Sequence, residues 1–368
     1  MRYMDEFRDP RLAGRLLEEI SREAAPLGEI TLMEVCGTHT VSIFRHGIRG
    51  LLPPQIRLLS GPGCPVCVTP VRYLDTAIAY GRMPSVILAT FGDMMRVPGS
   101  RSTLEREKAA GRDVRVVYSA MDALELAVRN REATVVFLGV GFETTAPTIA
   151  ASIMEARRRG VSNFTVLSGH KLVPPAMEAL VKGGGPALDG FICPPHVSAV
   201  IGTGPYEPLA RDHHVPCVIT GFEPLDILEG ILMLVRQIRR AEHRVEIQYR
   251  RVVTPAGNPA AVEIMQEVFE AEEGIWRGIG SIPQSGLGIR EPYKELDVTR
   301  RMEVVVEAPQ EDKGCRCGEV LRGLLRPPEC GLFGRSCAPD HPVGACMVSS
   351  EGTCAAYYKY GGPFQGRQ

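Results

Sequence analysis

The 368-residue chain has no long apolar run and no excess of charge of either sign. Its 42 lysine and arginine residues are balanced by 43 aspartate and glutamate residues, which leaves a formal net charge of −1. Proteins that bind nucleic acid carry an excess of basic residues for phosphate contacts, so this balance argues against that class. No apolar stretch reaches the roughly 20 residues that a membrane-spanning helix requires.

Two further signals are missing. The first residues, Met1 to Arg8, are charged and lack the apolar segment of a secretory signal, so we expect a cytoplasmic protein. The chain also lacks the sequence G-x-x-x-x-G-K-[ST], so a P-loop nucleotide site is not expected. Because 44% of the residues are hydrophobic and 23% are charged, the chain has the composition of an ordinary folded protein.

Cysteine, in contrast, is abundant and unevenly distributed. Six of the 11 cysteines lie between Cys315 and Cys354. In a cytoplasmic protein, such a group indicates metal binding or redox chemistry more than a secreted-type disulfide framework.

Short apolar runs rich in β-branched residues alternate with longer helical patterns from residue 29 to residue 240. Their continuous apolarity indicates strands buried on both faces, as in parallel sheets, and the intervening stretches are long enough for helical crossovers. The predicted strands are Ile30–Val35, Ile56–Leu59, Val86–Ala89, Val114–Tyr118, Val135–Val140, Phe164–Leu167, Gly190–Ile192 and Val215–Ile219.

We therefore expect an α/β fold of two similar lobes with parallel sheets flanked by helices, plus a small cysteine-rich C-terminal domain. The expected boundaries are 1–130 for the first lobe, 131–240 for the second, and 241–368 for a mixed segment with the C-terminal domain. Similar loops, Gly-Phe-Glu-Thr at 141–144 and Gly-Phe-Glu-Pro at 221–224, favour two lobes over a single eight-stranded barrel.

The last third of the chain is less regular. Val262–Phe269 has a helical pattern, whereas Gly278–Gly288 is so rich in glycine, serine and proline that no long regular element is expected there. From Gly314 onward there is little apolar periodicity. This segment therefore needs metal, disulfides or docking to stay ordered.

Ligands of open α/β sheets bind beyond the carboxyl ends of the strands, and the loops at those predicted ends carry unusual residues. Cys64 and Cys67 form a C-x-x-C pair at the start of a predicted helix, where a lowered cysteine pKa and higher reactivity are expected. Such a pair is a redox dithiol, half of a metal site or, as a simpler alternative, two buried structural cysteines. Cys36 and His39, at the neighbouring strand end, favour the metal interpretation, because thiolates suit iron or zinc.

Other residues near strand ends have simpler interpretations of equal or greater weight. His170 and His196 are either functional or helix caps, and Asp93 and Glu143 are either acids and bases or caps. Cys193 and Cys217 lie beside strands and are better explained as core residues.

The tail cysteines have the spacing C-x-C-x12-C-x6-C-x8-C-x7-C. The paired C-x2-C hooks of a zinc site are absent, although a structural zinc site remains an alternative. A [4Fe–4S] cluster needs four thiolates, so six cysteines would leave one pair over. A dithiol beside a cluster provides a path for electrons into a disulfide.

Taken together, these motifs closely resemble the hydrogenase maturation protein HypD family. The resemblance covers roughly residues 29–360 in order, with no departure at any cysteine. The motifs that carry it are Glu34-Val35-Cys36-Gly37-Thr38-His39-Thr40, Gly61-Pro62-Gly63-Cys64-Pro65-Val66-Cys67, Gly141-Phe142-Glu143-Thr144-Thr145-Ala146-Pro147, Ser168-Gly169-His170-Lys171 and Pro342-Val343-Gly344-Ala345-Cys346-Met347.

The resemblance implies an assembly factor for the Fe(CN)2CO unit of [NiFe]-hydrogenases, which works with a small HypC-like chaperone and a HypE-like cyanide donor. It implies that Cys36 shares the iron with a chaperone cysteine, while Cys64 and Cys67 are a redox dithiol or further iron ligands, with His39 beside them. For the tail it implies two groups of cysteines. The [4Fe–4S] ligands would be Cys315, Cys330, Cys337 and Cys354, and the exchangeable pair would be Cys317 and Cys346.

A second function class remains open, namely a stand-alone iron–sulfur disulfide reductase. Such an enzyme needs only the dithiol and the cluster. The Cys36–His39 motif distinguishes the two, because only the assembly factor has a use for it. On this interpretation the protein is a metal-cofactor assembly factor with a redox role and is not an enzyme in the usual sense.

Overall fold

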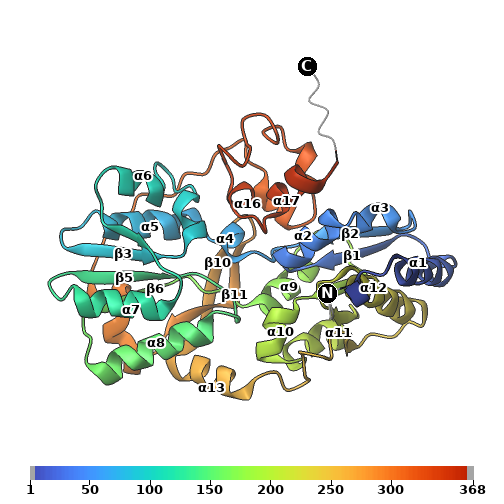
Figure 1. Cartoon of the computed structure of the whole chain (residues 1–368), viewed down its shortest axis with the longest axis horizontal. Coiled ribbons are helices and arrows are strands. Elements are labelled where there is room, and N and C mark those ends of the chain that lie inside the picture. Colours follow the sequence, from blue (N-terminus) through green and yellow to red (C-terminus); the bar gives the residue numbers. More distant parts are fainter. Residues whose placement is uncertain (1–4, 363–368) are drawn as a thin grey trace.

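The computed structural model describes residues 5–362 and contains two parallel sheets side by side (Figure 1). The first sheet has the strand order β2-β1-β7-β8-β9, and the second has the order β4-β3-β5-β6. The strands of the first sheet are β1 (Ile30–Glu34), β2 (Ile56–Ser60), β7 (Gly190–Cys193), β8 (Cys217–Ile219) and β9 (Val245–Ile247). Those of the second are β3 (Val86–Thr90), β4 (Val114–Val116), β5 (Thr134–Gly139) and β6 (Phe164–Ser168).

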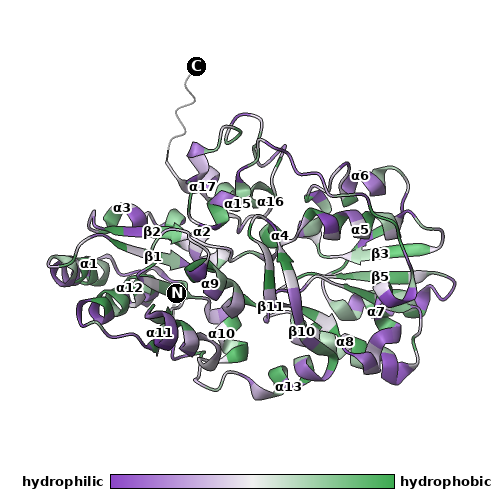
Figure 2. Ribbon diagram, turned by 180° about the vertical axis from the view of Figure 1, so that it is seen from behind, coloured by the Kyte–Doolittle hydropathy of each residue, from purple (hydrophilic) through white to green (hydrophobic). Residues whose placement is uncertain are grey.

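All eight predicted strands are present and parallel, and β9 is an additional strand. Buried side chains cover both faces of each sheet, which explains the continuous apolar runs. Strands β3 and β5 are hydrophobic along most of their length in Figure 2.

The expected boundary at residue 130 does not separate the two sheets. The first sheet combines residues 30–60 with residues 190–247, and the second sheet lies between them in sequence, at residues 86–168. The reason is that β1 pairs with β7 as well as with β2, a choice of neighbour on which apolar runs carry no information. The sheets are also unequal, with five and four strands.

Helices cover the sheets on both faces. Those packed around the first sheet are α1 (Pro10–Ala24), α2 (Gly37–Arg45), α3 (Ile48–Leu51), α10 (Pro195–Ile201), α11 (Glu207–His213) and α12 (Pro224–Arg239). Those around the second are α5 (Val71–Gly81), α6 (Leu104–Ala109), α7 (Ala120–Arg129), α8 (Ala146–Arg159), α13 (Pro259–Val268) and α14 (Val298–Arg301). Helix α9 (Val173–Lys182) lies on the side of the first sheet, where it contacts α11 (Figure 1). Short 3-10 helices are Asp5–Phe7, Gly92–Arg96, Gly204–Tyr206, Glu291–Leu296 and Pro327–Glu329.

Local sequence explains the helix at the N-terminal end. The Asp9 side chain caps α1 by accepting from the Arg11 amide at 2.8 Å, and Pro10 occupies the first turn. Ile20 and Ala24 are fully buried, while much of the rest of the helix is exposed. Helix α1 is therefore amphipathic, with its apolar side against the core.

The segment Gly278–Gly288 is where the sequence-based expectation is wrong. It is part of an antiparallel hairpin formed by β10 (Phe269–Trp276) and β11 (Gly280–Ile289), with a register shift between Glu272 and Gly274. Glycines at the turn have positive φ, 74° at Gly278 and 104° at Gly280, so the glycine-rich composition serves the turn. The predicted helix at Val262–Phe269 is confirmed as α13.

The cysteine-rich tail folds as three short helices over the junction between the two sheets (red in Figure 1). These are α15 (Cys317–Leu321), α16 (Ala345–Val348) and α17 (Thr353–Tyr360). The tail's own core is small, with Phe333, Cys337 and Met347 as its buried members. Helix α16 rests on α4 (Pro65–Val68), and α17 rests on α2, so docking supplies most of its order. Within residues 5–362, no helix combines the length and the apolar character that crossing a bilayer requires.

Candidate functional site

The loops that follow β1 and β2 lie against each other at one end of the first sheet. The strands are parallel and in register, with Glu34 opposite Ser60. The Gly37 amide donates to the Gly63 carbonyl at 3.0 Å, and a Cβ on Gly63 would lie only 2.2 Å from the Cys36 nitrogen. Backbone therefore packs on backbone, and the loops that carry Cys36 and Cys64 come together as the strand order predicts.

Cys36 is the N-cap of α2, and the residue is only 8% exposed. Burial raises the pKa of Cys36 to about 12, although the amides of His39 and Thr38 donate to the sulfur. The nearby Glu351 and Glu34 carboxylates raise the pKa further. A metal ion bound at this sulfur would replace the proton and stabilise the thiolate.

Glu34 is a buried acid next to Cys36. It belongs to the first of the sequence motifs, but the sequence alone gave it no functional role. Its Oε1 accepts from the Thr40 hydroxyl at 2.6 Å, and its Oε2 accepts from the Cys36 amide at 3.2 Å. Burial raises the pKa of Glu34 to about 7, against hydrogen bonds from Ser60 and Thr40 that lower it. The signal was available, since an acid at the end of an apolar strand needs a reason to be buried.

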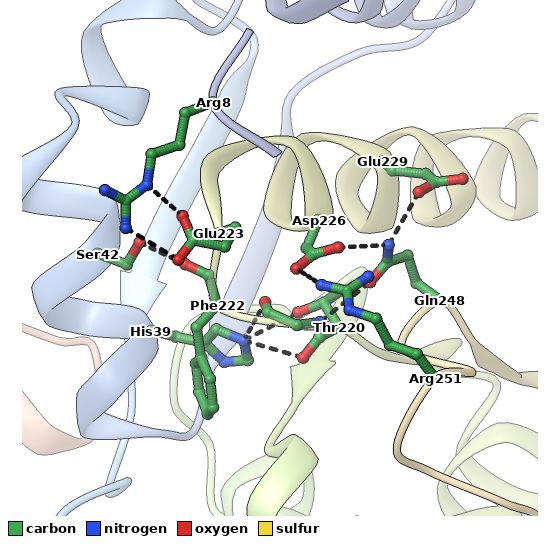
Figure 3. A network of polar contacts seen from close by, with 11 residues as sticks. Arg8, His39, Ser42, Thr220, Phe222, Glu223, Asp226, Glu229, Gln248 and Arg251 are labelled. Carbon is green, nitrogen blue, oxygen red and sulfur yellow. Dashed lines mark hydrogen bonds and ion pairs between the residues drawn. The ribbon is translucent and has the colours of Figure 1, made fainter. Parts of the chain in front are cut away.

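His39 connects α2 to the loop after β8 (Figure 3). Its Nε2 lies 3.0 Å from the Gly221 carbonyl oxygen, so we assign the ring proton to that nitrogen, which donates. Burial lowers the pKa of His39 to about 4, and the ring is therefore neutral near pH 7. Its Nδ1 is buried and has no partner among the described residues. The ring packs on Phe222 with centroids 4.9 Å apart.

Charged pairs hold the surroundings of that loop in place. Arg8 forms two hydrogen bonds with Glu223, and Arg251 pairs with the buried Asp226 of α12 (Figure 3). Gln248 accepts from the Gly221 amide at 3.0 Å and donates to Asp226 at 2.9 Å. Gly221, whose carbonyl accepts from His39, is thus held by Gln248 at its own amide and by the Arg8–Glu223 pair two residues later.

The C-x-x-C pair lies directly under the tail. The Cys64 thiol donates to the Ser349 hydroxyl at 3.3 Å, and the Cys67 sulfur lies 4.0 Å from the Ala345 carbonyl oxygen. Cys67 contacts the thiols of both Cys64 and Cys346.

The structure contradicts the expected reactivity of Cys67. Its contact with Cys346 lowers the pKa, but the contact with Cys64 and burial raise it, and the net pKa lies well above the usual value. The physical reason is that Cys67 is fully buried among other thiols in a four-residue helix, so the helix terminus has little effect.

The six tail cysteines line a single cavity, as the cluster prediction requires. Cys317 contacts both Cys315 and Cys346, and Cys346 also contacts Cys354. Among residues 5–362, no group of three or more His, Cys, Asp or Glu side chains is already arranged to hold a metal ion. The residues lining the cavity are Cys315, Cys317, Cys330, Cys337, Cys346 and Cys354 with apolar neighbours.

The chemistry of this donor set fits a [4Fe–4S] cluster, which needs four thiolates in an apolar setting. Three tail cysteines are buried: Cys346 is 1% exposed, and Cys317 and Cys337 are each 7% exposed. Of these, Cys346 contacts Cys67. A path of touching thiols therefore runs from Cys64 through Cys67 and Cys346 to Cys317.

Glu351 is a site residue that sequence reasoning missed. Its Oε1 accepts from the Thr38 hydroxyl at 2.8 Å, and a Cβ on Gly37 would lie 2.5 Å from its Cβ. Its carboxylate therefore faces the start of α2, beside Cys36. No local pattern signals this contact, because Thr38 and Glu351 are 313 residues apart in sequence.

The other candidates divide into two groups. His196 is near the thiol site, because its ring packs on Phe222 at 4.5 Å and the Glu351 charge acts on it. His170, Glu143 and Asp93 belong instead to the second sheet.

At the second sheet, Glu143 accepts from the Val173 amide at 2.9 Å, and His170 pairs with Ser168 at 3.1 Å. Asp93 is exposed. None of the three lines the cavity of the tail cysteines. Cys193 and Cys217 are fully buried in the first sheet with their thiols in contact, which agrees with a core position.

Comparison with known proteins places nearly the whole chain in one family. Residues 11–361 match a family model described as "HypD: Hydrogenase formation hypA family". The chain is 49% identical over 368 residues to the hydrogenase maturation factor HypD of Azotobacter vinelandii, covering 98% of this chain and 97% of that protein. It is 47% identical to the factor of Rhodobacter capsulatus, covering 98% and 99%, and 44% identical to that of Escherichia coli (strain K12), covering 98% of each.

Proposed function

We propose, from the premise that this chain belongs to the HypD family of hydrogenase maturation factors, that it assembles the Fe(CN)2CO unit of a [NiFe]-hydrogenase at the Cys36 loop. The observation that carries the proposal is the convergence of three thiol groups at one end of the first sheet. They are Cys36, the Cys64–Cys67 pair and the tail cysteines.

Cys36 binds the iron, which is the cargo. Its sulfur is a soft anionic ligand once deprotonated, and the Thr38 and His39 amides stabilise that charge. A small HypC-like chaperone supplies a second cysteine to the same iron. Glu34 and His39 act as positioning residues, since one accepts from the Cys36 amide and the other fixes α2.

Cys64 and Cys67 exchange electrons with the tail. Oxidation of this dithiol to a disulfide releases two electrons and two protons, which reduce a Cys317–Cys346 disulfide to two thiols. The Cys67–Cys346 contact is the place where the mixed disulfide forms. A [4Fe–4S] cluster held by Cys315, Cys330, Cys337 and Cys354 supplies one-electron chemistry to this pair when bound.

A HypE-like cyanide donor delivers ligands to the iron, and the chain serves as an assembly factor for its partners. The alternative of a stand-alone disulfide reductase explains the dithiol and the tail but gives the Cys36 loop no role. The close packing of Cys36 against Gly63, one residue before the dithiol, supports the assembly function.

The test is Cys36→Ser, purified anaerobically with its small chaperone and examined by infrared spectroscopy. We expect the bands of iron-bound cyanide and carbonyl to be lost while the fold and the tail cluster persist, because serine is a hard ligand that is not deprotonated near pH 7. Cys193→Ser is the matched control, as it changes a buried cysteine of the same sheet, and it should keep the bands.

Cys64→Ser separates the redox step from iron binding. It should block ligand attachment without preventing the chaperone from docking. Bands of wild-type intensity in Cys36→Ser would disprove Cys36 as the iron ligand, and a wild-type complex without any such bands would disprove the assembly role and favour the reductase.

A further inference from the structure

A basic cavity lies between strand β2 and the tail, and none of the cysteines lines it. Its volume is about 510 Å³, within the usual range of small-ligand sites. Three arginines line it, Arg49, Arg57 and Arg326, together with Tyr357 and a single acid, Glu329.

Arg49 forms the inner wall. Its Nη1 donates to the Leu58 carbonyl, its Nη2 donates to the Ser60 hydroxyl at 2.8 Å, and its guanidinium lies 4.5 Å from the Phe44 ring centroid. The Nε is buried and has no partner among the described residues. A guanidinium has five N–H donors, so Arg49 is held rigidly while donors remain unused.

The outer wall carries further unused donors. The Arg57 side chain is exposed on β2 and forms no hydrogen bond or close ion pair with any residue of 5–362, although its charge acts on Glu329. Arg326 pairs with Glu329 at 3.1 Å, and the Tyr357 ring lies near both Arg326 and Arg49. Among the lining residues, three cations face one carboxylate, which leaves an excess of two positive charges; the buried Glu34 carboxyl lies behind Arg49 and outside the lining.

We propose that this cavity binds a small molecule through its phosphate group. A dianionic phosphate matches the excess charge, and planar guanidinium groups bind phosphate oxygens in pairs. Side chains of β2, α3 and the tail make the site, in a chain that has no glycine-rich phosphate loop. The apolar edges of Phe44 and Tyr357, with ring centroids 5.1 Å apart, provide a surface for the rest of the ligand.

Binding here would act on two parts of the molecule. A phosphate bridging Arg57 of β2 and Arg326 of the tail would hold the tail on the first sheet. Arg49 is also connected to the thiol site, since it donates to Ser60, which in turn hydrogen-bonds to Glu34, the acceptor of the Cys36 amide.

The experiment is calorimetric titration of the full-length, cluster-loaded protein with pyrophosphate at about 150 mM NaCl, where long-range attraction is screened. We expect saturable binding at one site per chain. Arg57→Gln and Arg326→Gln should each weaken it about tenfold, the equivalent of one charge-assisted hydrogen bond. Arg45→Gln, which removes an exposed arginine of α2 outside the cavity, should leave it unchanged.

Hydrogen exchange supplies an independent measurement. Pyrophosphate should slow exchange of the amides of 320–329 and 353–360, which face the cavity, and not those of α7. Absence of binding at millimolar pyrophosphate, or full affinity in both Arg57→Gln and Arg326→Gln, would overturn the site. Equally tight binding of malonate would overturn the assignment to phosphate and point to a carboxylate-bearing partner.

Discussion

The first sheet carries Cys36 and Cys64 at the ends of its strands, whereas the second sheet carries Glu143, His170 and Lys171 at the corresponding ends. We call these two sets of strand ends and their loops the first edge, or thiol edge, and the second edge; both are largely buried. They differ in the segment that covers them, which is the tail for the first sheet and the β10–β11 hairpin for the second.

The hairpin closes the second edge with backbone contacts. The Leu172 amide donates to the Ser285 carbonyl at 2.8 Å, and the Ser168 hydroxyl donates to the Leu287 carbonyl at 2.6 Å. The tail, in contrast, reaches the first edge through contacts in which at least one partner is a side chain, as in the Thr38–Glu351 hydrogen bond and the contact of Cys67 with the Ala345 carbonyl. Side-chain contacts are more easily broken and remade than a backbone ladder. The tail can therefore move away from the thiol loops and return more easily than the hairpin can leave the second edge.

The largest expected effect comes from removing a cluster ligand. Cys330→Ala should reduce the iron content of the tail from about four per chain toward zero, because it removes one of the four thiolates proposed to hold the [4Fe–4S] centre. Hydrogen exchange should then speed up at the first edge, in residues 61–69, and stay slow at 168–173. Cys346→Ser is the control and should retain the iron. A colourless wild-type protein with stoichiometric zinc would contradict the assignment.

The glycines of the two edges provide the next test. Gly63→Ala places a methyl group 2.2 Å from a backbone nitrogen, which cannot move alone, and we expect a loss of about 3–4 kcal/mol in unfolding free energy. Gly141→Ala meets the Thr145 hydroxyl, which can rotate away, and the Thr145 Cβ at 2.9 Å, which must shift slightly, so it should cost less, about 1–2 kcal/mol. Chemical denaturation measures both. Equal losses would show that the two edges are packed alike. Gly14→Ala, with open space around it, should not destabilise.

Glu143 tests the electrostatics of the second edge. Burial raises the pKa of Glu143 from 4.5 to about 7, so folding penalises its charged form. The penalty is full above pH 7 and disappears as the pH falls toward 4.5. Glu143→Gln should therefore raise the unfolding free energy at pH 8 by as much as about 3 kcal/mol, and by little at pH 4.5. A gain that does not change with pH would mean that folding does not raise the pKa of this carboxyl.

The smallest effect belongs to the contact between tail and sheet. Thr38→Val removes the hydroxyl that donates to Glu351 at 2.8 Å, and the expected loss in unfolding free energy is about 1 kcal/mol. Thr38→Ser keeps the donor and should restore most of it. If valine costs nothing, the tail is held by other contacts.

Continuous apolar runs were sufficient to predict β1 to β8, because a strand buried on both faces has no polar alternation to obscure it. The same rule misses β9, whose three residues are only partly buried, and β10, where an acidic run such as Glu272–Glu273 lies on the exposed face. The pairing of β1 with β7 could not be predicted, because it depends on packing between distant segments.

The cysteines of the site could be predicted because strand ends in parallel sheets face one edge. The residues that shape their environment could not. Glu351 reaches Cys36 only through the docking of the tail, and the burial of Cys67 among other thiols reverses the pKa expected from its position in a helix. Tertiary contacts, which no local pattern encodes, determine both.

The interleaved order of the strands has a consequence for synthesis. The second sheet is complete once residue 168 has left the ribosome, whereas the first must wait for β9 at residues 245–247. The Thr31–Asp189 contact, which joins β1 to the start of β7, spans 158 residues. During that delay the Cys36 and Cys64 loops belong to an unfinished sheet, and the tail that buries them is translated last. A nascent chain of this protein therefore exposes its reactive thiols to oxidants for most of its elongation, and a reducing environment matters most before the chain is complete.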